Sequence, residues 1–210
     1  QRAIGIGALI FTFTGMHRVY LFRHEFMSDK KNLEVIKKLV PTSVIGAIMG
    51  GLLISYLNVK VLAFLIVIVS VYFIYKTLRQ ILGRTIHTKA PHKYSQVVVS
   101  VFSGFLQGSG MPGSDIRNNY LRTILSEISV RAVGSVLGII NFFIAGSIIF
   151  LHNHLTERDL IFIASIIPLL LPVQIYGKKF LDKMKDRDAK LLAVTFSVVG
   201  VVLLVFKYLV

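Results

Sequence analysis

Long apolar runs separated by short charged clusters dominate the sequence. Each run is roughly 20 residues long, which is enough for an α-helix to cross about 30 Å of hydrocarbon. Pro41 falls in the first turn of the second run, where its missing N–H costs little, and Gly46 and Gly50 follow on helical spacing, which favours close helix packing. The pattern predicts membrane-spanning helices at 2–22, 39–57, 61–78, 132–151, 159–177 and 190–209.

Residues 94–131 do not fit this pattern. An apolar segment ends near Phe105, a glycine-rich stretch follows it, and a more polar helical stretch is expected from Asp115 to Ser129. Four glycines and a proline lie within the ten residues 104–113, a composition that is incompatible with an unbroken helix across a bilayer. The sequence therefore predicts a helix break here, and we expect the substrate to bind at it.

Composition assigns the chain to the membrane and accounts for its charge. The hydrophobic share is 54% and the charged share 16%, more apolar than a soluble domain of this size usually is. The formal net charge of +14 is concentrated between the apolar runs, and basic loops of multi-pass proteins usually face the cytoplasm. We therefore expect a plasma-membrane protein with cytoplasmic loops at 23–38, 79–93 and 178–190, and no nucleic-acid partner.

Three short motifs recur in the same order, each about 130 residues further on. Residues 2–5 (RAIG) recur as 131–134 (RAVG), Pro41 with Gly46 recurs as Pro172 with Gly177, and 60–63 (KVLA) recurs as 190–193 (KLLA). We infer two copies of one unit, a first repeat at 1–93 and a second at 94–210. The counterpart of 94–130 is expected to precede Gln1.

Loop charge predicts that the two repeats have opposite orientations. The loop after the first span, 23–38, is strongly basic, whereas its counterpart at 152–158 is nearly neutral and the next loop, 178–190, is rich in Lys. Both ends of 94–131 must then lie on the cytoplasmic side, which a re-entrant hairpin satisfies. The predicted fold class is an all-α polytopic membrane protein with two inverted repeats, each a Gly-broken re-entrant helix followed by three transmembrane helices, as in secondary transporters.

The break has the chemistry of an anion site. The second arm of the hairpin begins near Pro112, so its free N–H groups and positive helix end point into the membrane, and glycine lets such donors approach a ligand closely. The alternative is that the glycines only allow tight packing. The predicted substrate-binding residues are Gly108, Ser109, Gly110, Met111, Pro112, Gly113, Ser114, Asp115, Arg131 and Ser135.

Several polar residues have two interpretations each. Arg131 and its repeat-mate Arg2 either attract anions or extend to lipid headgroups. Polar side chains within the predicted spans either line a path or bond to carbonyls of their own helix, and those that follow the break either guide an anion or face water. The first group is Thr12, Thr14, Ser135 and Asn141, and the second is Arg117, Asn118, Asn119 and Arg122.

Catalytic and metal-binding motifs are missing from the sequence. There is no cysteine, and no pattern of a zinc, nucleotide or nucleophilic catalytic site is present, so we expect neither an enzyme nor a metal or other cofactor. Asp115 is the one candidate for an intramembrane proton carrier. The coupling ion, proton or sodium, and the oligomeric state, including a homo-oligomer, are left open.

The chain resembles the TauE/SafE family of sulfite and organosulfonate exporters, also called the TSUP family. The resemblance rests on Gly104-x3-Gly108-x-Gly110-x2-Gly113, on 131–135 and on the glycines that follow Pro41. It implies a secondary transporter of a small anion, most simply a sulfur-containing one, that works by alternating access. A Gly-Gly-Gly run of the family is replaced here by 110–113 (GMPG). The alternatives are an anion channel and a non-transporting assembly or sensor module.

Overall fold

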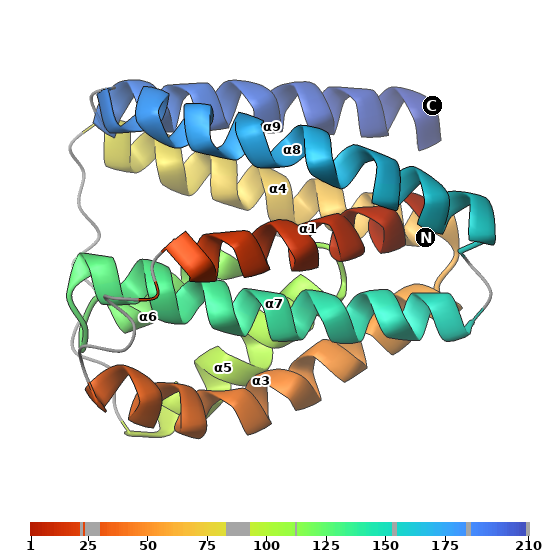
Figure 1. The fold of residues 1–210 in the computed structure, drawn as a ribbon. Coiled ribbons are helices and arrows are strands. Elements are labelled where there is room, and N and C mark those ends of the chain that lie inside the picture. Colours follow the sequence, from red (N-terminus) through yellow and green to blue (C-terminus); the bar gives the residue numbers. More distant parts are fainter. Residues whose placement is uncertain are drawn as a thin grey trace. The chain divides into compact units, whose positions relative to one another are not determined.

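Every element of the computed structural model is an α-helix within the residues that it describes, which are 1–21, 23, 30–82, 93–111, 113–152, 155–183 and 186–208. The predicted all-helical class is confirmed for these ranges. The helices, shown in Figure 1, are α1 (Arg2–Leu21), α3 (Lys30–Tyr56), α4 (Val59–Ile81), α5 (Lys93–Gly108), α6 (Ser114–Leu121), α7 (Glu127–Leu151), α8 (Glu157–Lys183) and α9 (Asp186–Tyr208).

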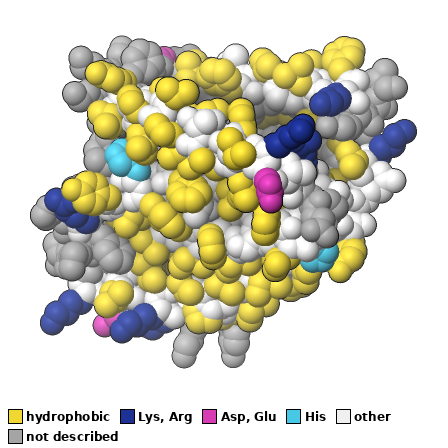
Figure 2. Space-filling model, turned by 45° about the vertical axis from the view of Figure 1, so that its right-hand side comes forward, with side chains coloured by type: hydrophobic (Ala, Val, Ile, Leu, Met, Phe, Trp, Pro, Cys, Tyr) yellow, Lys and Arg dark blue, Asp and Glu magenta, His cyan; other side chains and the backbone are white. Residues whose placement is uncertain are grey.

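Five stretches of these helices are long and apolar enough to cross a membrane. Each overlaps a predicted span. Hydrophobic side chains cover much of the face shown in Figure 2, as expected where lipid replaces water. The sixth predicted span forms α1, which does not reach the same hydropathy and carries His17 and Arg18 near its end. The five stretches are Lys30–Tyr56, Val59–Arg79, Ser129–Leu151, Glu157–Tyr176 and Lys190–Lys207. The chain is a multi-pass membrane protein.

The chain divides into two compact units. One contains Gln1–Tyr56 and Ala90–Leu170, and the other contains Leu57–Lys89 and Leu171–Val210. In the first unit α7 packs along α1 on one side and against α3 on the other, and α3 crosses α5 (Figure 1). In the second unit α4 packs along α9. The glycine-rich break and the helices around it all belong to the first unit.

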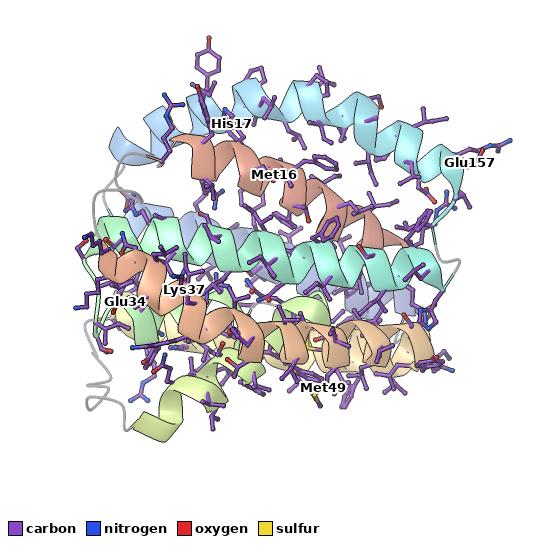
Figure 3. The ribbon with its side chains drawn as sticks, turned by 60° about the horizontal axis from the view of Figure 1, so that its bottom comes forward. Met16, His17, Glu34, Lys37, Met49 and Glu157 are labelled. Carbon is purple, nitrogen blue, oxygen red and sulfur yellow. The ribbon has the colours of Figure 1, made fainter. Side chains whose placement is uncertain are left out.

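The predicted loop at 23–38 is wrong over its second half, because α3 already begins at Lys30. The charged residues there lie on the outer side of an amphipathic helix, where Glu34 and Lys37 project away from it (Figure 3). Its inner side has a helical apolar spacing that buries it against α6 and α7. The core cluster formed there contains Val35, Ile36, Leu39, Leu121, Val130, Val133 and Leu137.

Pro41 is therefore inside α3 and not in its first turn, which corrects the prediction. The proline is exposed, on the side of α3 opposite the buried Ser43 and Gly46. Met49, which is 54% exposed, also projects outward, as Figure 3 shows. A proline removes one helix hydrogen bond wherever it lies in a helix interior.

The other two predicted basic loops are also partly helical. The helix α4 continues to Ile81, and α8 and α9 leave only a short link between Lys183 and Asp186. Residues 83–92 and 184–185 lie outside the described residues. Lys and Arg are good helix formers, so a helix can extend past the apolar stretch that crosses the membrane.

The predicted polar stretch from Asp115 to Ser129 is not continuous. The helix α6 ends at Leu121, and α7 begins at Glu127, where the Ser126 hydroxyl accepts a hydrogen bond from the Ser129 N–H at 3.3 Å. Serine is a favoured N-cap because its side chain satisfies a free helix donor. Because α7 starts this early, its first turns lie over α6.

The crossing of α3 and α5 depends on glycines from both helices. A Cβ on any of four glycines would overlap a carbonyl oxygen of the facing helix, so the two backbones are in direct contact. This agrees with the packing role that their spacing predicts. The four pairs are Gly46 with Val101, Gly50 with Phe105, Gly104 with Ser43, and Gly108 with Ala47.

We expect Gly46→Ala to separate α3 from α5 and lower the free energy of unfolding by about 1–3 kcal/mol, because the added methyl group meets backbone that cannot rotate away. Thermal unfolding in detergent measures the effect. Gly7→Ala is the matched control, because a Cβ on Gly7 has nothing within 4 Å. Equal melting temperatures for the two variants would contradict the direct backbone contact.

Candidate functional site

The predicted helix break is confirmed, and it begins with a tight cap on the end of α5. Gly110 has a φ of +69°, a left-handed conformation that glycine adopts without strain. Its N–H donates to the Gln107 carbonyl at 3.1 Å, and the Met111 N–H donates to the Leu106 carbonyl at 2.8 Å. This is the pair of bonds that defines a Schellman cap. Pro112 lies outside the described residues.

The cap uses donors that the sequence had assigned to a ligand. The N–H groups of Ser109, Gly110 and Met111 all donate to carbonyls of α5, and the Ser109 hydroxyl donates to the Phe105 carbonyl at 2.7 Å. Free backbone donors are therefore expected only at the start of α6, where the first N–H groups have no partner within the helix. Gly113 is the N-cap there and has no side-chain cap.

Asp115 changes the electrostatics of this helix end. It lies in the first turn of α6 and is exposed. A carboxylate at this position stabilises the helix dipole, and for the same reason it opposes a second anion at the helix end. The N-terminus of α6 therefore does not by itself explain an anion site, and a further positive group is needed.

Arg117 supplies that positive group from within the protein. It is only 3% exposed. One terminal nitrogen, Nη1, donates to Gln107 Oε1 at 2.8 Å, and the other, Nη2, donates to the Gly134 carbonyl at 2.8 Å. Gln107 Oε1 also accepts from Asn141 Nδ2 at 2.7 Å, and Asn141 Oδ1 accepts from the Ser43 hydroxyl at 2.8 Å. This chain of bonds, the Arg117 network, connects α3, α5, α6 and α7.

Among the residues that the structure describes, no carboxylate forms an ion pair with Arg117. All partners in the Arg117 network are neutral amides, carbonyls or hydroxyls. Asp115, two residues away on the same helix, acts on this charge electrostatically but does not form an ion pair with it, since side chains at this spacing do not face each other. Because a buried charge without an opposite partner is costly, an anion bound next to Arg117 would relieve that cost.

The other predicted site residues have less specific surroundings. Arg131 is exposed at the start of α7, and the Ser135 hydroxyl donates to its carbonyl at 2.8 Å. Arg2, the repeat-mate of Arg131, forms an ion pair with Asp159 at 2.7 Å, so its charge is already compensated. Ser114 is half-buried beside the Gly113 cap. The surroundings of Arg117 are therefore better suited to an anion than those of Arg131 or Arg2.

Sequence reasoning was right for some polar residues of the spans and wrong for others. Thr12, Thr14 and Ser135 bond to carbonyls of their own helices, as the simpler interpretation predicts. Asn141 instead bonds to two other helices, and Arg117 does not face water. Gln107 and Ser43 were not recognised at all. Each is a polar residue on the glycine-containing side of an otherwise apolar helix, and this pattern could have identified them.

The break also borders a cavity, and the lining of this cavity is apolar. The cavity has a volume of about 400 Å³ and is lined by small and aromatic side chains together with the tip of the break. Within the described residues, no group of three or more His, Cys, Asp or Glu side chains could hold a metal ion. The cavity lining is Ala3, Ile4, Gly7, Ala8, Phe11, Gly110, Met111 and Phe142, which offers an anion no charged partner.

The described helices define a multi-pass membrane protein in which a broken helix carries a buried arginine. The chain matches the family model described as sulfite exporter TauE/SafE over residues 1–205, which is nearly its whole length. It therefore belongs to the TauE/SafE family of membrane transporters. No curated protein and no solved structure matches it.

We expect Asn141→Leu to destabilise the protein by about 1–2 kcal/mol, because it removes a bond to Gln107 and leaves the Ser43 hydroxyl without its acceptor. Thermal unfolding in detergent measures the loss. Ser135→Ala on the same helix removes only a bond to its own helix carbonyl, so its effect should stay within about 0.5 kcal/mol. A loss for Asn141→Leu no larger than that of this control would argue against the Arg117 network.

Proposed function

We propose that the protein is a secondary transporter of a small, sulfur-containing anion. The observation that carries the proposal is the buried guanidinium of Arg117, which has neutral partners only. Such a group attracts an anion strongly in a low-dielectric interior. Membership of the TauE/SafE family supports the sulfur-containing class.

The broken helix positions this charge. The Schellman cap at Gly110 ends α5 and redirects the chain, so that α6 places Arg117 against Gln107. We propose that the anion binds between Arg117 and the first turn of α6 at Gly113 and Ser114. In this arrangement 108–111 shape the turn, while Arg131 and Ser135 lie along the route by which the anion enters.

Alternating access between two inverted repeats, 1–93 and 94–210, completes the proposal. Helices that the repeat makes equivalent also pack against each other, since α1 packs along α7 and α4 along α9. Pairing of equivalent helices is expected where two copies are related by an axis in the membrane plane. We further propose that the basic segments face the cytoplasm and that the protein resides in the plasma membrane.

Proteoliposomes test the function directly. We expect uptake of labelled sulfite to saturate and to be accelerated by unlabelled sulfite inside. Arg117→Gln should lower it about a hundredfold, since the charge opposite the anion is lost. Arg122→Gln, which changes an exposed arginine directly after α6, is the matched control and should retain uptake.

Arg117→Lys distinguishes a loss of charge from a loss of structure. Lysine keeps the positive charge but lacks the planar set of N–H donors of the guanidinium. It should restore part of the uptake that Arg117→Gln loses. Uptake by Arg117→Gln equal to that of the wild type would refute the site. Uptake that neither saturates nor shows counterflow would indicate a channel, and the absence of both uptake and sulfite-dependent thermal stabilisation would indicate a non-transporting module.

Asp115→Asn tests the charge at the helix end. Removing a carboxylate near the anion should lower the apparent KM for sulfite about two- to twentyfold, the range for one charge roughly 10 Å away between the dielectric of water and that of a protein surface. Asp188→Asn, an exposed carboxylate of α9, should leave KM unchanged. Loss of the dependence of uptake on a pH gradient in Asp115→Asn would instead make Asp115 the proton carrier.

A further inference from the structure

Two buried polar atoms beside each other in the sequence lack any hydrogen-bond partner in the structure. One is Nε of Arg117, a donor, and the other is Oδ1 of Asn118, an acceptor. Buried polar atoms in native proteins are nearly always bonded to protein, water or a ligand. The pair therefore indicates that something with both kinds of group completes this site.

The two side chains converge on α7 at Gly134. The position that a Cβ would take on Gly134 lies 2.9 Å from Asn118 Oδ1 and 3.6 Å from Arg117 Nη2. Because Gly134 has no side chain, both groups can pack directly against α7 there. The guanidinium is also fixed there, since Nη2 donates to the Gly134 carbonyl and Nη1 to Gln107.

A donor next to an acceptor discriminates between ligands that carry the same charge. A fully deprotonated oxyanion has only lone pairs, so it can accept from Arg117 Nε but repels Asn118 Oδ1. An oxyanion with its own O–H can accept from the first and donate to the second. Leaving a buried acceptor unpaired costs enough to reduce binding tenfold or more, as sites built for a ligand hydroxyl show.

Resting on the proposed anion transport, we propose that Arg117 and Asn118 form a paired donor and acceptor subsite that selects an oxyanion carrying its own hydrogen-bond donor. The chemical class includes a protonated sulfur oxyanion and a sulfonate with a nearby hydroxyl. Arg117 supplies the attraction for the charge, and Asn118 supplies the preference for the hydroxyl.

Two sulfonates of the same charge and nearly the same size test this subsite. Ethanesulfonate and 2-hydroxyethanesulfonate are compared as competitors of labelled sulfite uptake, and as stabilisers of the purified protein against heat, a readout that needs no transport. We expect the wild type to prefer the hydroxyl-bearing compound by about tenfold or more. Asn118→Leu should reduce the preference to less than about twofold.

Asn119→Leu is the matched control, because Asn119 is the next residue of α6 and its Oδ1 accepts an exposed hydrogen bond from Arg122 Nη1 at 3.3 Å. It should keep the preference of the wild type. Gly134→Ala is a second variant in case Asn118→Leu does not fold, because the added methyl group meets Asn118 Oδ1 at 2.9 Å. This variant too should lose the preference.

The outcomes separate the subsite from the transport function. Equal competition by the two sulfonates in the wild type, or no competition by either while sulfite is taken up, would overturn the subsite and leave transport standing. A preference that survives in both Asn118→Leu and Gly134→Ala would also overturn it. Absence of sulfite uptake together with absence of stabilisation by sulfite or either sulfonate would overturn the transport proposal, and the subsite with it.

Discussion

Backbone groups at a helix end inside a membrane protein must find partners within the protein, because hydrocarbon offers none. The end of α5 meets this requirement with the cap at Gly110, where a left-handed residue returns two N–H groups to the carbonyls of the last turn. Only glycine fits easily at a φ of +69°. The position of α6, and with it the position of Arg117, depends on this cap.

The Arg117 network connects the broken helix to α3 and α7. Its bonds connect four helices through side chains that are distant in the sequence, such as Ser43, Gln107 and Asn141. The glycine contact between α3 and α5 brings these side chains close enough to bond. Close packing and polar chemistry are therefore coupled, and a change that separates the two helices also disturbs the surroundings of the buried cation.

The predictions from sequence succeeded where local chemistry decides the structure. Five apolar runs became the membrane-length helices, and the glycine-rich stretch ended α5. The predictions were wrong where burial against another helix decides the structure. Residues 30–38 form a helix because one side of them packs on α6 and α7. The charges along the sequence do not reveal that these two helices lie there. Pro41 was misplaced for the same reason.

By itself the sequence determined that this is a multi-pass helical protein with one conspicuous helix break, since hydrophobic length and glycine content act locally. Which groups at the break are available to a ligand was decided by the tertiary structure. Donors at Ser109, Gly110 and Met111 are used by the cap, while Arg117 is buried and its hydrogen bonds go to neutral groups. Hydrogen bonds between helices that are far apart in the sequence determine which groups are available, and residue spacing along the chain does not reveal these bonds.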